Sequence, residues 1–222
     1  MIRTFASGDL FYLLLAARWT LGLSLIAFAG GGLVGIVLAV LRIARGRVPR
    51  AVAAGYVQLF QGTPLLMQLF VVYFGMGIFG YDVPALVAAA VALTLYAAAF
   101  LADIWRGALQ AVPKAQWEGA TALGFGFLQQ LRLVILPQAV RLAVPPTVGF
   151  LVQLVKNTSL ASIVGFIELT RAGQIINNAT FQPFLVFLVV AAIYFALCFP
   201  LSVLSRRLEA RLAYAGTTTW TP

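Results

Sequence analysis

The chain has 222 residues, of which 62% are hydrophobic and only 9% are charged, and its net charge is +9. A soluble domain normally carries about 25% charged residues, so this composition excludes a water-exposed globular protein and predicts a chain solvated mainly by lipid. Histidine is absent, which removes the commonest general base and metal ligand. The single cysteine, Cys198, lies in an apolar run and is expected to be a small core residue.

The N-terminal segment is expected to be retained and to form a short helix ahead of the first membrane span. A cleavable signal peptide is not indicated, because Arg3 is the only basic residue before the apolar region and Asp9 follows it. Ser7 or Asp9 suits the cap of a helix over 7–18. The leucine-rich composition of that segment predicts that it lies along the membrane interface.

Apolar runs between charged residues predict five membrane-spanning helices. The second run is polar in its middle, where Gln61, Thr63 and Gln68 surround Pro64. A proline removes one backbone donor, so Pro64 is expected to kink this helix. The expected spans are 19–41, 55–80, 84–105, 142–163 and 183–205.

Basic residues gather in alternate connections, which predicts the orientation of the chain. With five spans, the connection after the first span, the connection after the third and the tail lie on one side. Together they hold eleven of the fifteen basic residues. This side is expected to be cytoplasmic, with the N-terminus outside and the C-terminus inside, and nucleic-acid binding is therefore not expected. The eleven residues are Arg42, Arg45, Arg47, Arg50, Arg106, Lys114, Arg132, Arg141, Arg206, Arg207 and Arg211.

The connection 106–141 is too polar to span a membrane, but its pattern is helical. Pro113 suits the first turn of a helix and Gly124 suits its end. Apolar residues then recur at helical spacing, which predicts a second short helix that ends at Pro137. Two short helices joined at a glycine are therefore expected on the cytoplasmic side. These helices would form a protruding knob. The alternative, from these residues alone, is an interfacial helical hairpin packed under the membrane.

The same connection resembles the EAA loop of ABC importer permeases. That motif reads Glu-Ala-Ala, three residues, Gly, nine residues, Ile, one residue, Leu-Pro, and Glu118, Ala120, Gly124 and Pro137 keep its spacing. Gly119 replaces an alanine and is expected to weaken the helix by about 1 kcal/mol, and a valine replaces the isoleucine. The resemblance implies a coupling helix that sits in a groove of a cytoplasmic ATPase. The implied coupling residues are Glu118, Gly119, Ala120, Gly124 and Pro137.

Two further stretches, 61–75 and 155–174, resemble the histidine, glutamine, arginine and glutamate permeases of this group. The resemblance covers most of 19–212. It implies an all-α integral membrane protein, the transmembrane domain of a type I ABC importer, with a single domain over 1–222. The membrane-spanning region would be 19–205 and the cytoplasmic coupling loop 106–141, between the third and fourth spans.

The resemblance also implies a function and a set of partners. The chain would be the permease subunit that moves polar amino acids into the cell by alternating access, in the bacterial cytoplasmic (inner) membrane. Its partners would be membrane lipid, a second permease subunit, identical or homologous, two cytoplasmic ATP-binding subunits and an extracytoplasmic amino-acid-binding protein.

No phosphate-binding loop of the form GxxxxGK[ST] occurs in the sequence. ATP and Mg²⁺ are therefore expected on the partner ATPase subunits, and no cofactor, metal site or catalytic residue is expected in this chain. An ion-coupled secondary transporter is the alternative function. It would need its own ion site, and intramembrane acids are nearly absent, although backbone carbonyls can bind Na⁺. A membrane-embedded enzyme is not expected, because it would need convergent catalytic groups and the sequence has no histidine, one cysteine and six acids.

Two polar clusters are the candidate substrate pathway, because polar groups at membrane depth need partners or a water-filled cavity. The first surrounds Pro64, and the second follows Lys156, which either faces a pathway or extends to the interface. Interhelical hydrogen bonding explains the first cluster equally well. Many relatives carry aspartate where this chain has Asn157, which favours a neutral or acidic polar amino acid unless Glu168 or a partner supplies a charge. The candidate residues are Gln61, Thr63, Gln68, Asn157, Thr158 and Ser159.

Two glycine patterns are expected to be structural. The segment 75–80 matches the GxGxxG dinucleotide fingerprint but lies at the end of a membrane span, where turn and packing glycines are expected. Gly31 and Gly35 match the GxxxG pattern and are expected to allow close contact between helices.

Overall fold

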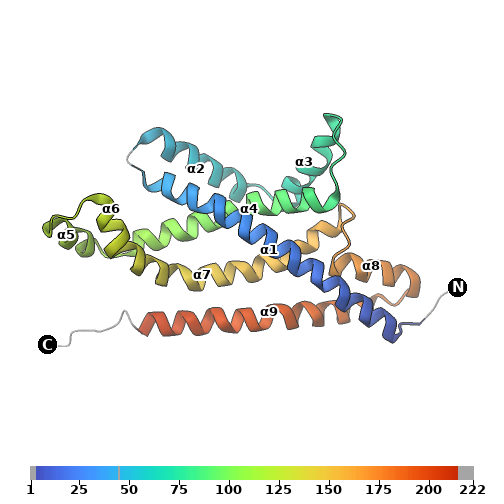
Figure 1. The fold of residues 1–222 in the computed structure, drawn as a ribbon. Coiled ribbons are helices and arrows are strands. Elements are labelled where there is room, and N and C mark those ends of the chain that lie inside the picture. The colour runs from blue at the N-terminus through green and yellow to red at the C-terminus, as the bar shows by residue number, and fades with distance from the viewer. Residues whose placement is uncertain (1–3, 45, 215–222) are drawn as a thin grey trace.

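A computed structural model of the chain describes residues 4–44 and 46–214, with side chains to residue 212, and every regular element in these ranges is helical (Figure 1). Four helical segments are long and apolar enough to span a membrane: α1 (Ser7–Ile43), α4 (Ala85–Ala111), Phe127–Ser162, which contains α7 (Leu136–Asn157), and Pro183–Leu212 of α9 (Pro183–Tyr214). A fifth is the bent pair α2 (Arg47–Gly62) and α3 (Leu65–Ile78), if it counts as one span. The all-helical class is confirmed.

Helix α1 is one continuous helix of 37 residues, so the prediction of a separate interfacial helix over 7–18 was wrong. Leu13 and Ala16 of that segment are buried in a cluster with residues of α8 (Leu169–Thr180) and α9. One side of this segment therefore packs on protein, while Phe11 and Leu14 on the rest of its surface are exposed. Neither Ser7 nor Asp9 is the N-cap, a position held by Ala6, and the Asp9 carboxylate accepts a 2.9 Å hydrogen bond from the Ala6 amide.

The close contact between α1 and α4 is the most extensive helix pair of the bundle. A β-carbon on Gly31 would lie 2.5 Å from the Ala97 Cβ, and one on Gly35 would lie 3.2 Å from the Ala98 carbonyl oxygen. Helix α4 presents alanines at this contact, so the two backbones approach more closely than larger side chains allow. The packing interpretation of Gly31 and Gly35 is confirmed.

The expected kink at Pro64 is confirmed, and the predicted span over 55–80 corresponds to a bent pair of helices rather than to one straight helix. Helix α2 begins at Arg47, and the two helices on either side of Thr63 and Pro64 differ in direction by 100°. Proline cannot donate a helical hydrogen bond, and Thr63 before it is extended, so the first helix ends there. Helix α3 ends at Ile78, and Gly80 has a φ of 80°, which confirms a turn role for Gly80, whereas Gly75 and Gly77 lie inside the helix.

The connection after α4 begins with α5 (Lys114–Ala122), preceded by Pro113 and followed by Gly124 with a φ of 75°. Both predicted boundaries are confirmed. The predicted stop at Pro137 was wrong, because α6 (Phe127–Gln129), the π-helical turn η1 (Gln130–Ile135) and α7 form one continuous helical segment. Pro137 directly follows the π-helical turn, whose wider spacing gives the proline ring room, so the helix continues through it.

The fourth and fifth spans also have boundaries that differ from the predicted ones. The fourth span is helical from Phe127, ahead of the predicted start at 142, and its last turn is the 3-10 helix η2 (Thr158–Ser162). Helix α9 continues past the predicted end at 205 to Tyr214. Cys198 is buried beside Val152 and Val155, which confirms its assignment to the core.

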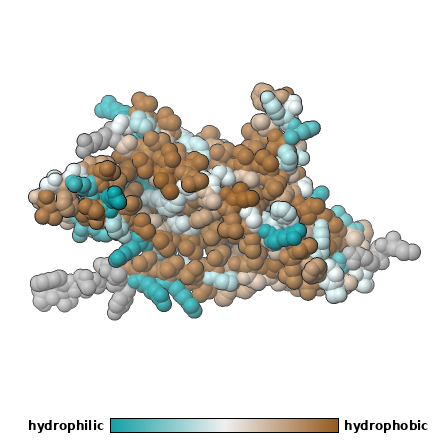
Figure 2. Space-filling model, in the orientation of Figure 1, coloured by the Kyte–Doolittle hydropathy of each residue, from teal (hydrophilic) through white to brown (hydrophobic). Residues whose placement is uncertain are grey.

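The helices of the bundle have two distinct ends (Figure 1). The α1–α2 connection, α5, α6 and the C-terminal end of α9 lie at one end, and the start of α1, the α3–α4 connection and α8 lie at the other. Figure 2 shows a broad hydrophobic surface between these ends, with hydrophilic residues gathered toward them. This distribution is that of a protein whose middle contacts lipid.

Candidate functional site

The break between α2 and α3 is held by the side chain of Gln68, which is buried. Its amide nitrogen donates to the Phe60 carbonyl at 2.8 Å, the Thr63 carbonyl at 3.1 Å and the Thr63 hydroxyl at 2.9 Å. The Thr63 hydroxyl also donates to the Leu59 carbonyl at 2.8 Å. These bonds satisfy carbonyls that the broken helix leaves free. Gln68 and Thr63 therefore stabilise the bend itself.

Gln61 lies apart from that network and lines a cavity of about 540 Å³ between α2, α4 and α7. Its amide donates to the Ala99 carbonyl at 3.4 Å. The same cavity is lined by Asp103, whose carboxylate accepts hydrogen bonds from Arg42 of α1 at 2.6 Å and from Arg106 at 2.9 Å. The three charged groups leave one net positive charge beside the cavity.

The second polar cluster lies at the far end of α7. Thr158 is fully buried and donates to the Val155 carbonyl at 2.8 Å, and Ser159 donates to the Lys156 carbonyl at 2.7 Å. Both hydroxyls therefore bond within their own helix, while Lys156 in the last turn is exposed. Asn157 is half-buried.

Asn157 is the member of this cluster that contacts the rest of the pathway region. It lines a cavity of about 10 Å³ together with Leu65 and Leu69 of α3, and the Tyr96 hydroxyl of α4 is within hydrogen-bonding reach of it. The structure thus brings the Asn157 segment against α3. The six predicted pathway residues, however, lie in separate environments: local bonds at the bend, the cavity beside Asp103, and the end of α7.

Glu168 is a fully buried acid that joins three helices at the end of the bundle that holds α8. Its carboxylate accepts hydrogen bonds from the Tyr194 hydroxyl of α9 at 2.7 Å, the Arg171 amide of α8 at 2.9 Å and the Thr20 hydroxyl of α1 at 3.4 Å. It is the N-cap of α8. Burial raises the pKa of this carboxyl, and its hydrogen bonds, first that from the Thr170 amide, oppose part of the effect.

Sequence reasoning missed the roles of Tyr96, Asp103 and Glu168. Asp103 carries a weak signal, because an acid inside an apolar helix is followed three residues later by Arg106. Glu168 precedes a helical segment, as N-cap residues do, but glutamate is not among the preferred caps. Each of the three residues also has a partner from a distant part of the chain: Asn157 for Tyr96, Arg42 for Asp103, and Thr20 for Glu168.

The predicted coupling residues lie at the end of the bundle that holds α5. Ala120 is buried, whereas Glu118, Gly119, Gly124 and Pro137 are exposed. Helix α5 is anchored by Trp117, which packs on a cluster that contains Val112, Ile135 and Ala139. The Gln130 amide adds hydrogen bonds to the Phe125 carbonyl at 2.7 Å and the Thr121 hydroxyl at 3.1 Å. These contacts hold α5 and the turn after it against η1 and the start of α7.

Comparison with known families identifies the chain. The model of the binding-protein-dependent transport system inner membrane components matches residues 31–214. The chain belongs to this family. It is 33% identical over 203 residues to the probable amino-acid ABC transporter permease protein YckA of Bacillus subtilis (strain 168), a match that covers 91% of this chain and 90% of the relative. It is also 33% identical to the glutamine transport system permease protein GlnP of Escherichia coli (strain K12), covering 88% of this chain and 90% of GlnP.

Solved structures of ABC transporters share the fold of this inner membrane component. A crystal structure of an amino acid ABC transporter with histidines superposes with a TM-score of 0.86 at 33% identity, covering 90% of this chain and 94% of that one. An inward-facing structure of the MetNI methionine ABC transporter superposes with a TM-score of 0.77 at 22% identity, covering 94% and 99%. The type I ABC importer fold is therefore confirmed, and the ABC permease interpretation is favoured over an ion-coupled transporter.

Proposed function

We propose that this permease belongs to an ATP-driven importer of polar amino acids and works by alternating access. The observation that carries the proposal is the match along nearly the whole chain to permeases named for amino-acid and glutamine transport. Its partners would be a second permease subunit, two cytoplasmic ATP-binding subunits that hold ATP and Mg²⁺, and an extracytoplasmic amino-acid-binding protein. Closure of the ATPase dimer would draw the coupling helices together and open the cavity outward.

The coupling contact is proposed to be the surface of α5 and the turn at Gly124. Glu118 is exposed on α5, and Leu123 beside the turn is 75% exposed. Ala120, between them in the sequence, is buried. Glu118 and Leu123 are proposed to contact the ATPase. Gly119, Gly124 and Pro137 are proposed to shape this surface.

The substrate pathway is proposed to lie on the side of α4 and α7 that carries the Asp103 cavity. Gln61 lines that cavity, and Asn157 lies farther along α7 beside α3. Thr63, Gln68, Thr158 and Ser159 are proposed to hold the backbone of the two pathway segments in shape. The net positive charge of Arg42, Arg106 and Asp103 supports a neutral or acidic amino acid over a cationic one.

The proposed orientation has the N-terminus outside and the C-terminus in the cytoplasm. It is supported by the arginine-rich connections, which share one end of the bundle (Figure 1). Cysteines introduced at Arg47 and Ala210 are expected to react in intact cells only with a membrane-permeant reagent. Labelling of either position by an impermeant reagent would overturn the orientation.

Reconstitution tests the function directly. The permease is purified with the ATPase that co-purifies with it, placed in proteoliposomes, and supplied with ATP inside and the cognate binding protein outside. Uptake of labelled glutamine, glutamate and arginine is then measured. We expect ATP-dependent uptake of at least one polar amino acid and no uptake driven by a Na⁺ or proton gradient alone. Gradient-driven uptake without ATP would refute the proposal.

A further inference from the structure

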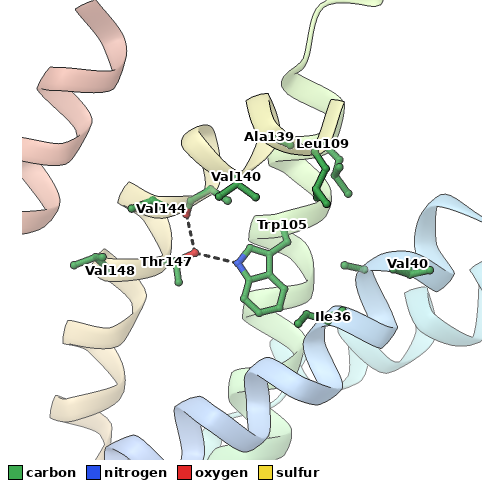
Figure 3. Close-up of a pocket in the computed structure, with 12 residues that line it drawn as sticks. Ile36, Val40, Trp105, Leu109, Ala139, Val140, Val144, Thr147 and Val148 are labelled. Atoms are coloured by element: carbon green, nitrogen blue, oxygen red, sulfur yellow. Dashed lines mark hydrogen bonds between the residues drawn. The ribbon is translucent and has the colours of Figure 1, made fainter. Parts of the chain in front are cut away.

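A long apolar groove lies between α1, α4 and α7, on a different face of the bundle from the Asp103 cavity. Its volume is about 540 Å³. Figure 3 shows residues that line it. On α4 it is lined by Trp105 and Leu109, which lie on the opposite side of that helix from Asp103 and Gly107 of the other cavity. The groove is thus separated from the proposed substrate pathway by the α4–α7 wall.

The groove offers no free polar group to a ligand. Its two polar side chains, Trp105 and Thr147, bond to one another: the indole nitrogen donates to the Thr147 hydroxyl at 3.1 Å, and that hydroxyl donates to the Ala143 carbonyl at 2.7 Å (Figure 3). The rest of the lining is aliphatic. A hydrocarbon chain matches this surface, whereas an amino acid would lose its hydration without replacement.

The length and position of the groove match one leaflet of a bilayer. Its wall on α7 runs from Leu136 to Val148, a rise of about 18 Å at 1.5 Å per residue. Half of a hydrocarbon core of about 30 Å is about 15 Å. A β-carbon at Gly32 of α1 would lie 3.7 Å from the Trp105 ring, so the indole meets α1 there. The Leu136 end adjoins a second cavity of about 240 Å³, lined by Leu109, Trp117 and Phe127, beside the coupling region.

A basic residue precedes the Leu136 end of the groove in the same helix. Arg132 is exposed in η1, about one helical turn before Leu136, and has no hydrogen-bond or ion-pair partner among the described residues. Basic residues at the cytoplasmic side of membrane helices attract the phosphates of anionic lipids. With the orientation proposed above, Arg132 lies at the depth of the inner-leaflet head groups.

We propose that this groove binds one acyl chain of an anionic phospholipid of the cytoplasmic leaflet, with Arg132 contacting its phosphate. The lipid would fill the space between α1 and α7 next to the segment that carries the coupling helix. This assignment rests on the proposed orientation, but it does not depend on the substrate of the transporter.

The test uses Trp105 as a built-in probe. The full permease with its co-purifying ATPase is placed in nanodiscs that contain either phosphatidylglycerol or phosphatidylcholine with brominated acyl chains. The difference in emission between the native chain and Trp105→Phe isolates the Trp105 signal. Half-maximal quenching is expected at about five-fold less phosphatidylglycerol than phosphatidylcholine, the preference that one arginine near an anionic head group gives.

Three variants locate the site. Arg132→Gln is expected to remove the five-fold preference, while Arg207→Gln, at an exposed arginine of α9 that does not line the groove, is expected to keep it. Ala143→Leu fills the groove and is expected to reduce quenching by both lipids. Native mass spectrometry of the native complex provides a check without a tryptophan substitution, since phosphatidylglycerol is expected to remain bound and to be lost in Arg132→Gln.

Three results would overturn the proposal. Trp105 unquenched by either lipid would mean that protein, such as a second copy of the chain, covers the groove. Equal quenching by the two lipids would remove the head-group contact. An unchanged preference in Arg132→Gln would assign the selectivity elsewhere. Because no transport is measured, none of these outcomes depends on the proposed function.

Discussion

Replacement of Glu168 by alanine should loosen the junction of α1, α8 and α9. The substitution removes the N-cap of α8, a loss of about 0.5–2 kcal/mol. It also leaves the buried Thr20 hydroxyl and the Tyr194 hydroxyl without their carboxylate acceptor, and one unsatisfied buried group costs about 1–3 kcal/mol. Tyr194 retains Thr170 at 3.0 Å, so a single such loss is counted. The expected total is about 1.5–5 kcal/mol.

Glutamine at position 168 separates hydrogen bonding from charge. It keeps one oxygen acceptor and the length of the side chain, so Glu168→Gln is expected to lose one hydrogen bond, about 0.5–1.5 kcal/mol. Because burial raises the pKa of Glu168, the folded state binds its proton more tightly than the unfolded state. The stabilising contribution of this carboxyl is therefore fully present below the ordinary glutamate pKa of about 4.3 and declines as pH rises through the folded value.

Thermal unfolding in detergent, followed over a pH series, measures both effects. The melting temperature of the native chain minus that of Glu168→Gln should fall as pH rises above about 4.3 and then level off. Glu209→Gln, at an exposed glutamate of α9, is the matched control and should change stability by less than about 0.5 kcal/mol. Equal melting temperatures for Glu168→Ala and Glu209→Gln would refute the assignment of Glu168 as the junction, and a pH-independent difference would refute the raised pKa.

Three further substitutions test packing, coupling and substrate choice. Gly31→Ala should destabilise the chain by about 1–3 kcal/mol through overpacking against α4. Gly22→Ala on the same helix is the control, because a β-carbon there would have no atom within 4 Å. Equal melting temperatures of the two variants would contradict the α1–α4 contact. Gly124→Val places a branched side chain at a φ of 75° and should uncouple ATP hydrolysis from uptake. Gly119→Ala, which restores the alanine of the EAA motif at an open helical position, should not, and normal uptake in Gly124→Val would remove the loop from the mechanism. Asn157→Asp should shift uptake toward arginine relative to glutamine in proteoliposomes, and an unchanged ranking at full activity would assign specificity to the binding protein.

Features that depend on neighbouring residues in the sequence were predictable. Pro113 and Gly124 bound α5 because proline and glycine act through their own backbone geometry. Small residues one helical turn apart predicted the contact surface of α1 at Gly31 and Gly35. These rules require no knowledge of the partner helix, so the sequence was sufficient.

Features that depend on distant partners were not predictable. Asp103 meets Arg42 across 61 positions of the chain, and Glu168 meets Thr20 across 148. Gln68 was assigned to a cavity because a polar side chain at membrane depth suggested one, but its partners are the carbonyls that the bend at Pro64 exposes. A sequence shows that a polar group needs a partner, while the fold decides which one it has.

The error at Pro137 has a mechanical consequence. Since the helix does not stop there, the segment Phe127–Ser162 runs for about 54 Å without interruption. One end is tied to α5 through Trp117 and Ile135, and the other carries Asn157 beside α3. A break at Pro137 would leave α5 free to move independently, whereas a continuous helix would carry a displacement of the proposed coupling surface toward the Asn157 end. Gly124→Val and Asn157→Asp therefore examine opposite ends of one structural element.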